Sequence, residues 1–205
     1  MKWAEVEDRS EGSEDTVRNF IQPALDAVPA GLASRLGTCR IRLLPRLDDP
    51  EAASRWTSSE TGLAVELAAA DVEPHDLALE LLVCLGQALW ELATENERTA
   101  WLKLLDAEMR AKVSGEIDED AWAEKQRILR SRVLARSPRR LMGYAGVSFA
   151  GTVAEYVHAL WHDVTVHSGP EHLPPEWLRR RLELLAHWFP PAAERDLFGG
   201  PGRVE

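Results

Sequence analysis

The segment 77–92, LALELLVCLGQALWEL, limits the possible folds of this chain more than any other segment. It is apolar around nearly the whole circumference of a helix, and such a helix has to be covered on several sides. Asp71 and Pro74 precede it and supply helix start signals. The few polar residues fall at helical spacing along one stripe: Glu80, Cys84, Gln87 and Glu91. The sequence therefore predicts a central buried helix whose polar stripe follows a solvated edge or faces a cleft.

Two segments before this helix have the alternation of β-strands. Residues 38–45, TCRIRLLP, set Cys39, Ile41 and Leu43 against two arginines, which is the pattern of a half-buried strand. Residues 62–69, GLAVELAA, place three aliphatic side chains on one face and lead almost directly into the central helix. A loop rich in Asp, Pro and Ser is expected between the two strands.

Apolar residues recur at helical spacing in most of the remaining chain. They predict helices over 15–28, in the charged segment 95–136, over 148–162 and over 176–188. Pro29 and Gly31 are expected to end the first helix, and Pro138 together with residues 143–146 is expected to mark a loop. The expected fold class is α+β: a mostly helical domain over 15–190, with a small N-terminal β-sheet packed on the central buried helix. A flexible acidic N-terminus over 1–14 and a loosely ordered tail over 191–205 are expected to flank it.

Composition restricts the partners and the compartment. The formal net charge of −10 and the pI near 5.2 oppose affinity for nucleic acid or an anionic membrane. No secretion signal or run of roughly 20 apolar residues is found, which predicts a cytoplasmic protein without a membrane span. Two cysteines, Cys39 and Cys84, fall in the first expected strand and the central helix. They are therefore expected to be reduced core thiols rather than a disulfide.

The order of these elements, together with three motifs, resembles the zincin-like metallopeptidases. Residues 83–90, VCLGQALW, are similar to the HELGHALW-like zinc helix of bacterial members, and Gly86 stands where HELGH sequences carry a glycine. Residues 149–157, FAGTVAEYV, are similar to the FAExFAxYV-like helix that follows in those proteins. Residues 173–185, LPPEWLRRRLELL, are similar to their short closing helix. The resemblance covers about residues 15–190 and implies a zincin-like domain.

The same resemblance removes the expected chemistry. In an HExxH peptidase two histidines four residues apart bind zinc, and a glutamate beside the first polarises the zinc-bound water. The corresponding positions here are Val83, Gln87 and Cys84, and the glutamate that supplies the third zinc ligand corresponds to Gly151. The resemblance therefore implies a catalytically inactive protein without metal or other cofactor, whose cleft or surface serves a protein or peptide partner in binding or scaffolding.

Two alternatives remain open from the residues themselves. Glu155, His158 and His162 form E-x-x-H-x-x-x-H, and histidines at i and i+4 present their imidazoles from one helix face. A divergent metal-dependent hydrolase rebuilt around these residues is the first alternative. The second is a plain helical protein-interaction module, since an all-round apolar helix and an amphipathic one also suit any α-rich domain.

Basic residues do not point to a nucleic-acid site. Segment 125–140 holds seven of them without interleaved aromatic residues, and an acidic cluster lies just before it. A solvated helix that pairs with nearby acids is therefore expected. The three arginines at 179–181 are likewise expected to be solvated or paired with Glu176 and Glu183.

Overall fold

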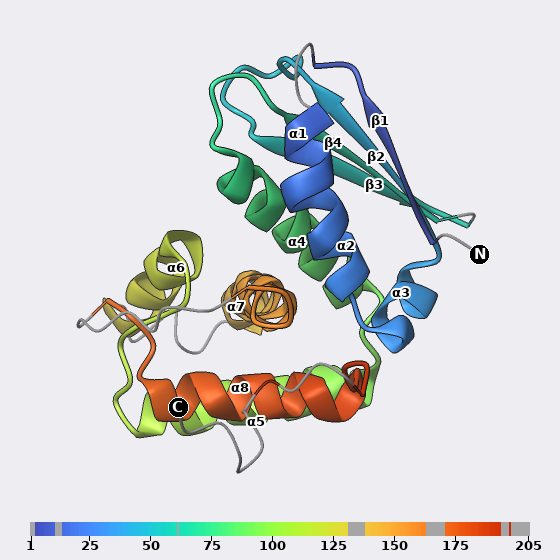
Figure 1. Cartoon of the computed structure of the whole chain (residues 1–205). Helices are drawn as coiled ribbons and strands as arrows, with labels where there is room; N and C mark the ends of the chain where they lie inside the picture. The colour runs from blue at the N-terminus through green and yellow to red at the C-terminus, as the bar shows by residue number, and fades with distance from the viewer. Residues whose placement is uncertain are drawn as a thin grey trace, which may run out of the picture.

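The structure is a computed structural model, and it describes residues 3–10, 14–60, 62–130, 138–162, 171–193 and 197. It confirms the α+β fold class, with a four-stranded sheet built from residues 4–68 and helices that make up most of the rest (Figure 1). Residues 131–137, where helix was predicted to continue, lie outside the described residues, as does most of the predicted tail over 191–205.

The sheet has three parallel strands and one antiparallel edge strand. In spatial order the strands are β1 (Ala4–Asp8), β2 (Thr38–Leu44), β4 (Gly62–Ala68) and β3 (Ser54–Ser59). Strands β2 and β4 confirm the two predicted strands, and they pair in parallel with each other. Strand β3 pairs antiparallel with β4 and ends the sheet.

The two outer strands were missed in the sequence. Strand β1 lies inside the segment 1–14 that was predicted to be flexible, and β3 lies in the expected loop. Both have mostly exposed side chains, so neither shows a clear apolar face. Their strand conformation comes from pairing with β2 and β4, whose own apolar residues are buried on the inner face of the sheet.

The helices follow the predicted order with two corrections. They are α1 (Glu14–Thr16), a π-helical turn (Val17–Ile21), α2 (Gln22–Ala27), α3 (Ala30–Leu36), α4 (Pro74–Glu91), α5 (Glu95–Arg110), α6 (Glu119–Arg130), α7 (Pro138–His158) and α8 (Pro175–Trp188). A helix over 30–36 was not expected, because Pro29 and Gly31 were predicted to end the preceding helix, and the helix expected over 148–162 runs from 138 to 158. The loop predicted at 143–146 is wrong, because α7 already begins at Pro138. Gly146 lies inside α7, and a Cβ there would sit 2.8 Å from Nε1 of Trp90. Its glycine thus serves close packing rather than a turn.

Helix α4 is central, as predicted. The sheet lies on one side of it with α2, and α7 crosses it on the other side (Figure 1). Helices α5 and α8 form a further layer beyond α7, while α6 flanks α7 (Figure 1). Helix α4 contributes nine buried residues, including Leu81, Leu82 and Leu85. Among the described residues no single helix is long and apolar enough to cross a membrane; α4 and α5 reach that composition only as a pair bent by 116°.

Candidate functional site

The four positions that the resemblance singles out lie on α4 and α7, and these two helices cross in close contact at Gly86 and Ala150. A Cβ at Gly86 would lie 2.7 Å from both Cα and O of Ala150, so the two backbones touch at this point. Gln87 follows Gly86 and Gly151 follows Ala150, so both residues flank the contact. We call Val83, Cys84, Gln87 and Gly151 the crossing positions. A glycine costs roughly 1 kcal/mol in a helix relative to alanine. The close approach of the two backbones is the physical reason for a glycine at position 86.

Two of the crossing positions are bonded to the edge strand β3. The indole Nε1 of Trp56 donates to Oε1 of Gln87 at 2.7 Å. The thiol of Cys84 donates to Oγ of Ser54 at 3.2 Å, and that hydroxyl donates to Oε1 of Glu80 at 2.5 Å. Three residues of the polar stripe, Glu80, Cys84 and Gln87, therefore face β3 and are bonded to side chains of that strand.

Gly151, the position that corresponds to the third zinc ligand, has a carboxylate directly beside it. A Cβ at Gly151 would overlap Oδ2 of Asp118, so the acid occupies the space that a side chain at 151 would need. Asp118 also caps α6, since its Oδ1 accepts from the backbone N–H of Ala121 at 2.7 Å. Burial, together with the nearby Glu116 and Asp120, raises the pKa of Asp118 despite that bond.

The crossing positions do not fit a zinc ion. Val83 has no lone pair, Gln87 is held by Trp56, and Gly151 has no side chain to offer. The position of the catalytic glutamate is held by Cys84, and burial raises the pKa of this thiol to about 11 although its bond to Ser54 lowers it. A buried thiol with such a pKa is protonated at neutral pH and is a poor nucleophile. Hydrolytic zinc chemistry therefore has no residues to support it here.

The alternative set of Glu155, His158 and His162 lies close together in the structure. His158 ends α7 and is only 9% exposed, and Glu155 lies one turn before it with Oε2 3.8 Å from its Nδ1. The Nε2 atom of His158 lies 3.0 Å from Nε2 of His75, which comes from the first turn of α4. His162 stacks on His158 with ring centroids 5.4 Å apart. The set predicted from the sequence is thus brought together, and it gains His75, which the sequence analysis missed because it is 83 residues away.

A second polar group is fully buried between α5, α6, α7 and α8. We call it the buried ion cluster: Arg181, Glu108, Glu116 and Lys125, each at most 1% exposed. The guanidinium of Arg181 donates to both oxygens of Glu108 at 2.7 and 2.6 Å and to both oxygens of Glu116 at 2.7 and 2.8 Å.

Lys125, which belongs to the cluster, and the neighbouring Tyr144 supply the remaining hydrogen-bond donors to Glu116. Nζ of Lys125 donates to Oε1 of Glu116 at 3.0 Å, and the Tyr144 hydroxyl donates to the same carboxylate. Two positive and two negative side chains balance, and every carboxylate oxygen has a donor. Such pairing is what buried charges need to persist in a folded protein. The cluster is therefore a structural element.

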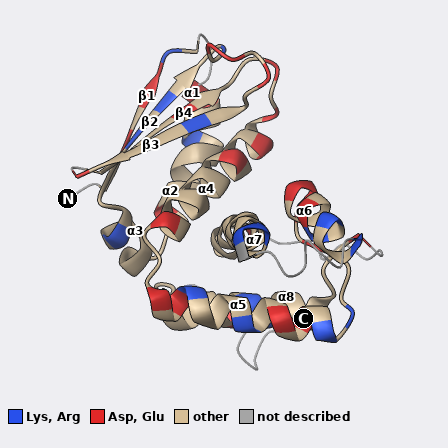
Figure 2. Ribbon diagram, turned by 180° about the vertical axis from the view of Figure 1, so that it is seen from behind, with Lys and Arg blue, Asp and Glu red and all other residues tan. Residues whose placement is uncertain are grey.

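The buried ion cluster corrects two predictions about basic residues. Arg181 was expected to be solvated or paired within its own helix, and it is instead fully buried between two other elements. Its neighbour Arg179 does pair with Glu183 at 2.9 Å, as predicted. Lys125 is also buried, whereas α6 otherwise carries acids in its first turn and arginines in its last, which Figure 2 shows as red and blue ends.

Comparison with family models, with curated proteins and with solved structures gives no match for this chain. The zincin-like resemblance therefore stays a prediction from the sequence motifs.

Proposed function

We propose that this chain is a zincin-like domain without peptidase activity, which binds a protein or peptide partner. The observation that carries the proposal is the state of the crossing positions. Gln87 and Cys84 are bonded to β3, Asp118 occupies the space beside Gly151, and α4 and α7 are in contact at the neighbouring residues Gly86 and Ala150. The α+β fold with strands at both predicted places supports it further. A cytoplasmic location stays a prediction from composition.

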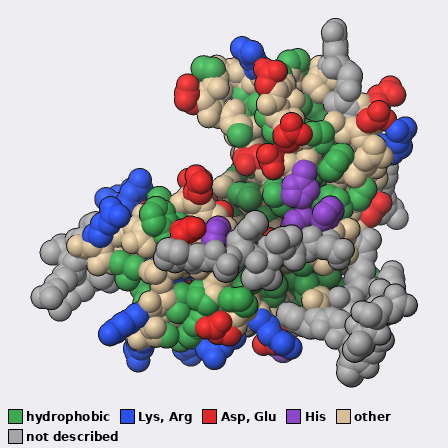
Figure 3. Space-filling view, turned by 60° about the vertical axis from the view of Figure 1, so that its left-hand side comes forward, with side chains coloured by type: hydrophobic (Ala, Val, Ile, Leu, Met, Phe, Trp, Pro, Cys, Tyr) green, Lys and Arg blue, Asp and Glu red, His purple; other side chains and the backbone are tan. Residues whose placement is uncertain are grey.

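The edge strand β3 is the docking element that we propose for the partner. It is the last strand of the sheet, and only β4 pairs with it among the described strands. An exposed edge offers unpaired N–H and C=O groups to an extended segment. Figure 3 shows the molecule hollowed beside the sheet, with acidic side chains around the hollow.

The chemistry of the partner follows from the charge of this region. A pocket at the start of α6 is lined by Asp118, Glu119, Asp120 and Glu171. Complementary charge speeds encounter and favours the right partner. The partner is therefore an extended segment that carries Lys or Arg.

Restoring the zinc ligands tests the zincin-like geometry directly. The variant Val83→His/Cys84→Glu/Gln87→His/Gly151→Glu would regain the ligand set, and Asp118→Ala makes room for the new side chain at 151. We expect it to bind one Zn²⁺ per chain when His75 and His158 are both replaced by alanine to remove other ligands. A folded variant that binds no zinc in metal analysis would contradict the zincin-like geometry.

Docking at β3 is tested with short labelled peptides and fluorescence anisotropy. A strand-forming peptide with alternating Lys residues should bind, and a peptide of equal length with Glu in place of Lys should not. Successive residues of a strand direct their N–H groups to opposite sides. One of the variants Thr57→Pro and Ser58→Pro therefore removes an outward donor while it leaves the pairing with β4.

Proline at the residue whose N–H pairs with β4 should disturb the fold, whereas proline at the other residue should leave the circular dichroism spectrum folded. That folded variant should lose peptide binding. Binding that persists in it, or equal binding of both peptides, would overturn docking at β3. Neither result would affect the restored zinc site, so the two parts of the proposal fail separately.

The structure bears on the two alternative functions, the helical interaction module and the metal-dependent hydrolase, to different extents. The zincin-like fold needed strands at 38–45 and 62–69, and β2 and β4 are present there, while the plain helical interaction module stays an untested alternative. The metal-dependent hydrolase around Glu155, His158 and His162 stays a candidate function. It is favoured by one specific observation, the contact between His158 and His75.

A further inference from the structure

Three histidines gather where the start of α4 meets the end of α7. His75 and His158 point their Nε2 atoms at each other across 3.0 Å, with their rings inclined at 67°. The ring centroid of His162 lies 5.5 Å from that of His75 and 5.4 Å from that of His158. Figure 3 shows histidine side chains clustered on this face of the molecule.

Each histidine of the close pair has a carboxylate on its other nitrogen. Nδ1 of His75 lies 3.8 Å from Oδ1 of Asp76, and Nδ1 of His158 lies 3.8 Å from Oε2 of Glu155. These carboxylates lie just beyond hydrogen-bond distance, so a small movement would let each one accept from Nδ1 while Nε2 faces an ion. Metal-binding histidines have this arrangement as a rule.

We propose that His75 and His158 bind a first-row transition metal ion of the Zn²⁺ type through their Nε2 atoms, with His162 as a third ligand. Imidazole nitrogens suit Zn²⁺, Co²⁺ and Ni²⁺. Two such nitrogens at a usual bond length to one ion are about 3.0 Å apart at a right angle and about 3.3 Å apart in a tetrahedron. The observed 3.0 Å, which is a hydrogen bond in this structure, already matches that span, and the two rings have to turn so that both lone pairs point at the ion.

The third ligand has to move. No three His, Cys, Asp or Glu side chains in the described part of the chain already converge as a metal site requires. His162 is exposed and lies one helical turn beyond His158. Exposed side chains exchange rotamers within nanoseconds, and turning His162 brings its nitrogen toward the pair. The ion then fixes this side chain and links α4 to α7.

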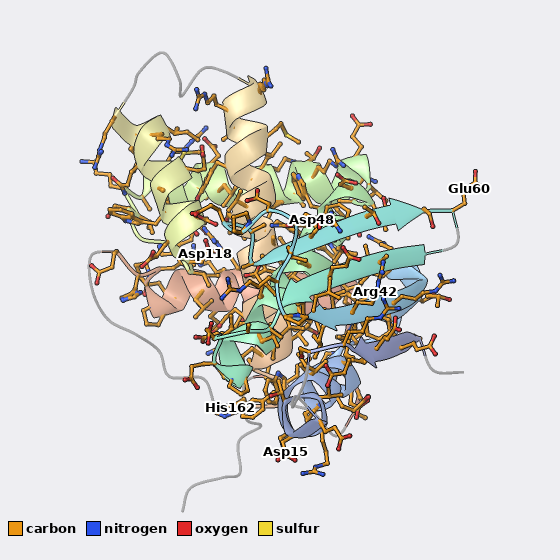
Figure 4. The ribbon with its side chains drawn as sticks, turned by 90° about the horizontal axis from the view of Figure 1, so that it is seen from above. Asp15, Arg42, Asp48, Glu60, Asp118 and His162 are labelled. Atoms are coloured by element: carbon orange, nitrogen blue, oxygen red, sulfur yellow. The ribbon has the colours of Figure 1, made fainter. Side chains whose placement is uncertain are left out.

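This metal site is separate from the crossing positions. His75 precedes Gln87 by 12 residues on the same helix, which corresponds to about 18 Å along the axis. Asp118, which covers Gly151, and His162 also lie well apart in Figure 4. Metal binding here is therefore independent of the proposed loss of zinc at the crossing positions, and of peptide docking at β3.

Isothermal titration of untagged, metal-free protein with Zn²⁺, Co²⁺ and Ni²⁺ tests the site. The wild type should bind one ion per chain, and Co²⁺ should give the visible absorption of nitrogen ligation. His75→Ala should abolish binding; His75 is partly exposed, so this variant should keep its fold. Glu155→Gln and Asp76→Asn should each weaken binding by about 10-fold or more, because the carboxylates orient the ligands.

The matched control is His187→Ala, which removes an exposed histidine from α8 and should leave the affinity unchanged. His158→Ala should lose binding like His75→Ala, and circular dichroism checks its fold, since His158 is buried. Wild-type protein that binds none of the three ions would overturn the proposal. So would equal affinity in His75→Ala, which would place any bound ion elsewhere.

Discussion

The crossing positions and the buried ion cluster come close to each other at Gly151 and Thr152 of α7. They differ in the kind of side chain that they bury. Gly151 is covered by Asp118, and the next residue, Thr152, has its Oγ1 3.5 Å from Nη1 of Arg181. At the crossing, positions that hold ligands in a zincin carry groups without that capacity. In the cluster, four full charges are buried and neutralise one another.

The comparison shows that a buried charge is not in itself a sign of chemistry. The most charged interior of this protein has every partner it needs and is closed to solvent. The region with the most informative motif is held instead by neutral hydrogen bonds and by backbone contact. Function has to be inferred from groups that still have capacity to bind, such as the edge of β3 and the histidine pair.

The largest expected effect is the loss of Arg181. Arg181→Met leaves Glu108 and Glu116 with Lys125 as their remaining cation, so the free energy of unfolding should fall by about 3–5 kcal/mol. Urea denaturation measures this. Arg179→Met on the same helix removes an exposed pair with Glu183 and should cost no more than about 1 kcal/mol. Equal losses would erase the contrast between buried and exposed pairs.

The buried ion cluster should also make stability depend on acid. Burial raises the pKa of Glu116, but Arg181, Lys125 and Tyr144 outweigh it and lower this pKa from 4.5 to about 2. The folded value is below the ordinary one, so the stabilisation is complete above 4.5 and is lost as the pH falls toward 2.

Urea denaturation across this pH range checks the dependence on Glu116. Glu116→Gln should show a flatter loss of stability toward acid than the wild type. The pKa of Asp118 is raised, mainly by burial, and so favours the folded state in acid. Asp118→Asn should therefore not flatten the loss. A flat wild-type curve would contradict a charged Glu116 in the cluster.

The helix crossing should be sensitive to a single methyl group. In Gly86→Ala the new Cβ would meet the backbone of Ala150 at 2.7 Å, and backbone cannot move aside cheaply. The free energy of unfolding should drop by about 1–3 kcal/mol. Gly143→Ala in α7 meets no atom within 4 Å and should instead raise stability by up to about 1 kcal/mol. A tolerated alanine at 86 would mean that the helices do not touch there.

The smallest expected effect concerns the thiols. Cys39 and Cys84 are both fully buried, and burial raises their pKa values to about 12 and about 11. A thiol-specific disulfide reagent at pH near 8 should therefore label neither residue in the folded protein and both after unfolding. Rapid labelling of Cys84 in the folded state would show that the crossing is open to solvent and reactive.

Much of the fold was predictable because apolar residues recur at strand or helix spacing within its main elements. The strands β2 and β4 and the helix α4 were found in this way, and so were most of the other helices. Strands β1 and β3 were missed because their conformation depends on a neighbour rather than on an apolar face of their own. The start of α7 was missed because Gly143 and Gly146 suggested a turn.

The candidate site was predictable only in its local parts. The identity of the crossing positions and the E-x-x-H-x-x-x-H spacing were visible in the sequence. Trp56 and Ser54 could have been noticed as the aromatic and hydroxyl residues of a short strand. No pattern along the chain pointed to Asp118 as the group that covers Gly151.

The sequence by itself determined which faces of the main strands and helices are buried, because burial there follows residue type and the spacing of a few positions. The tertiary structure alone decided that His75 meets His158 and that Arg181 lies between Glu108 and Glu116. These partners are 65 to 83 residues apart. They meet only because α7 and α8 pack against helices formed much earlier in the chain, and packing of that kind leaves no period in the sequence.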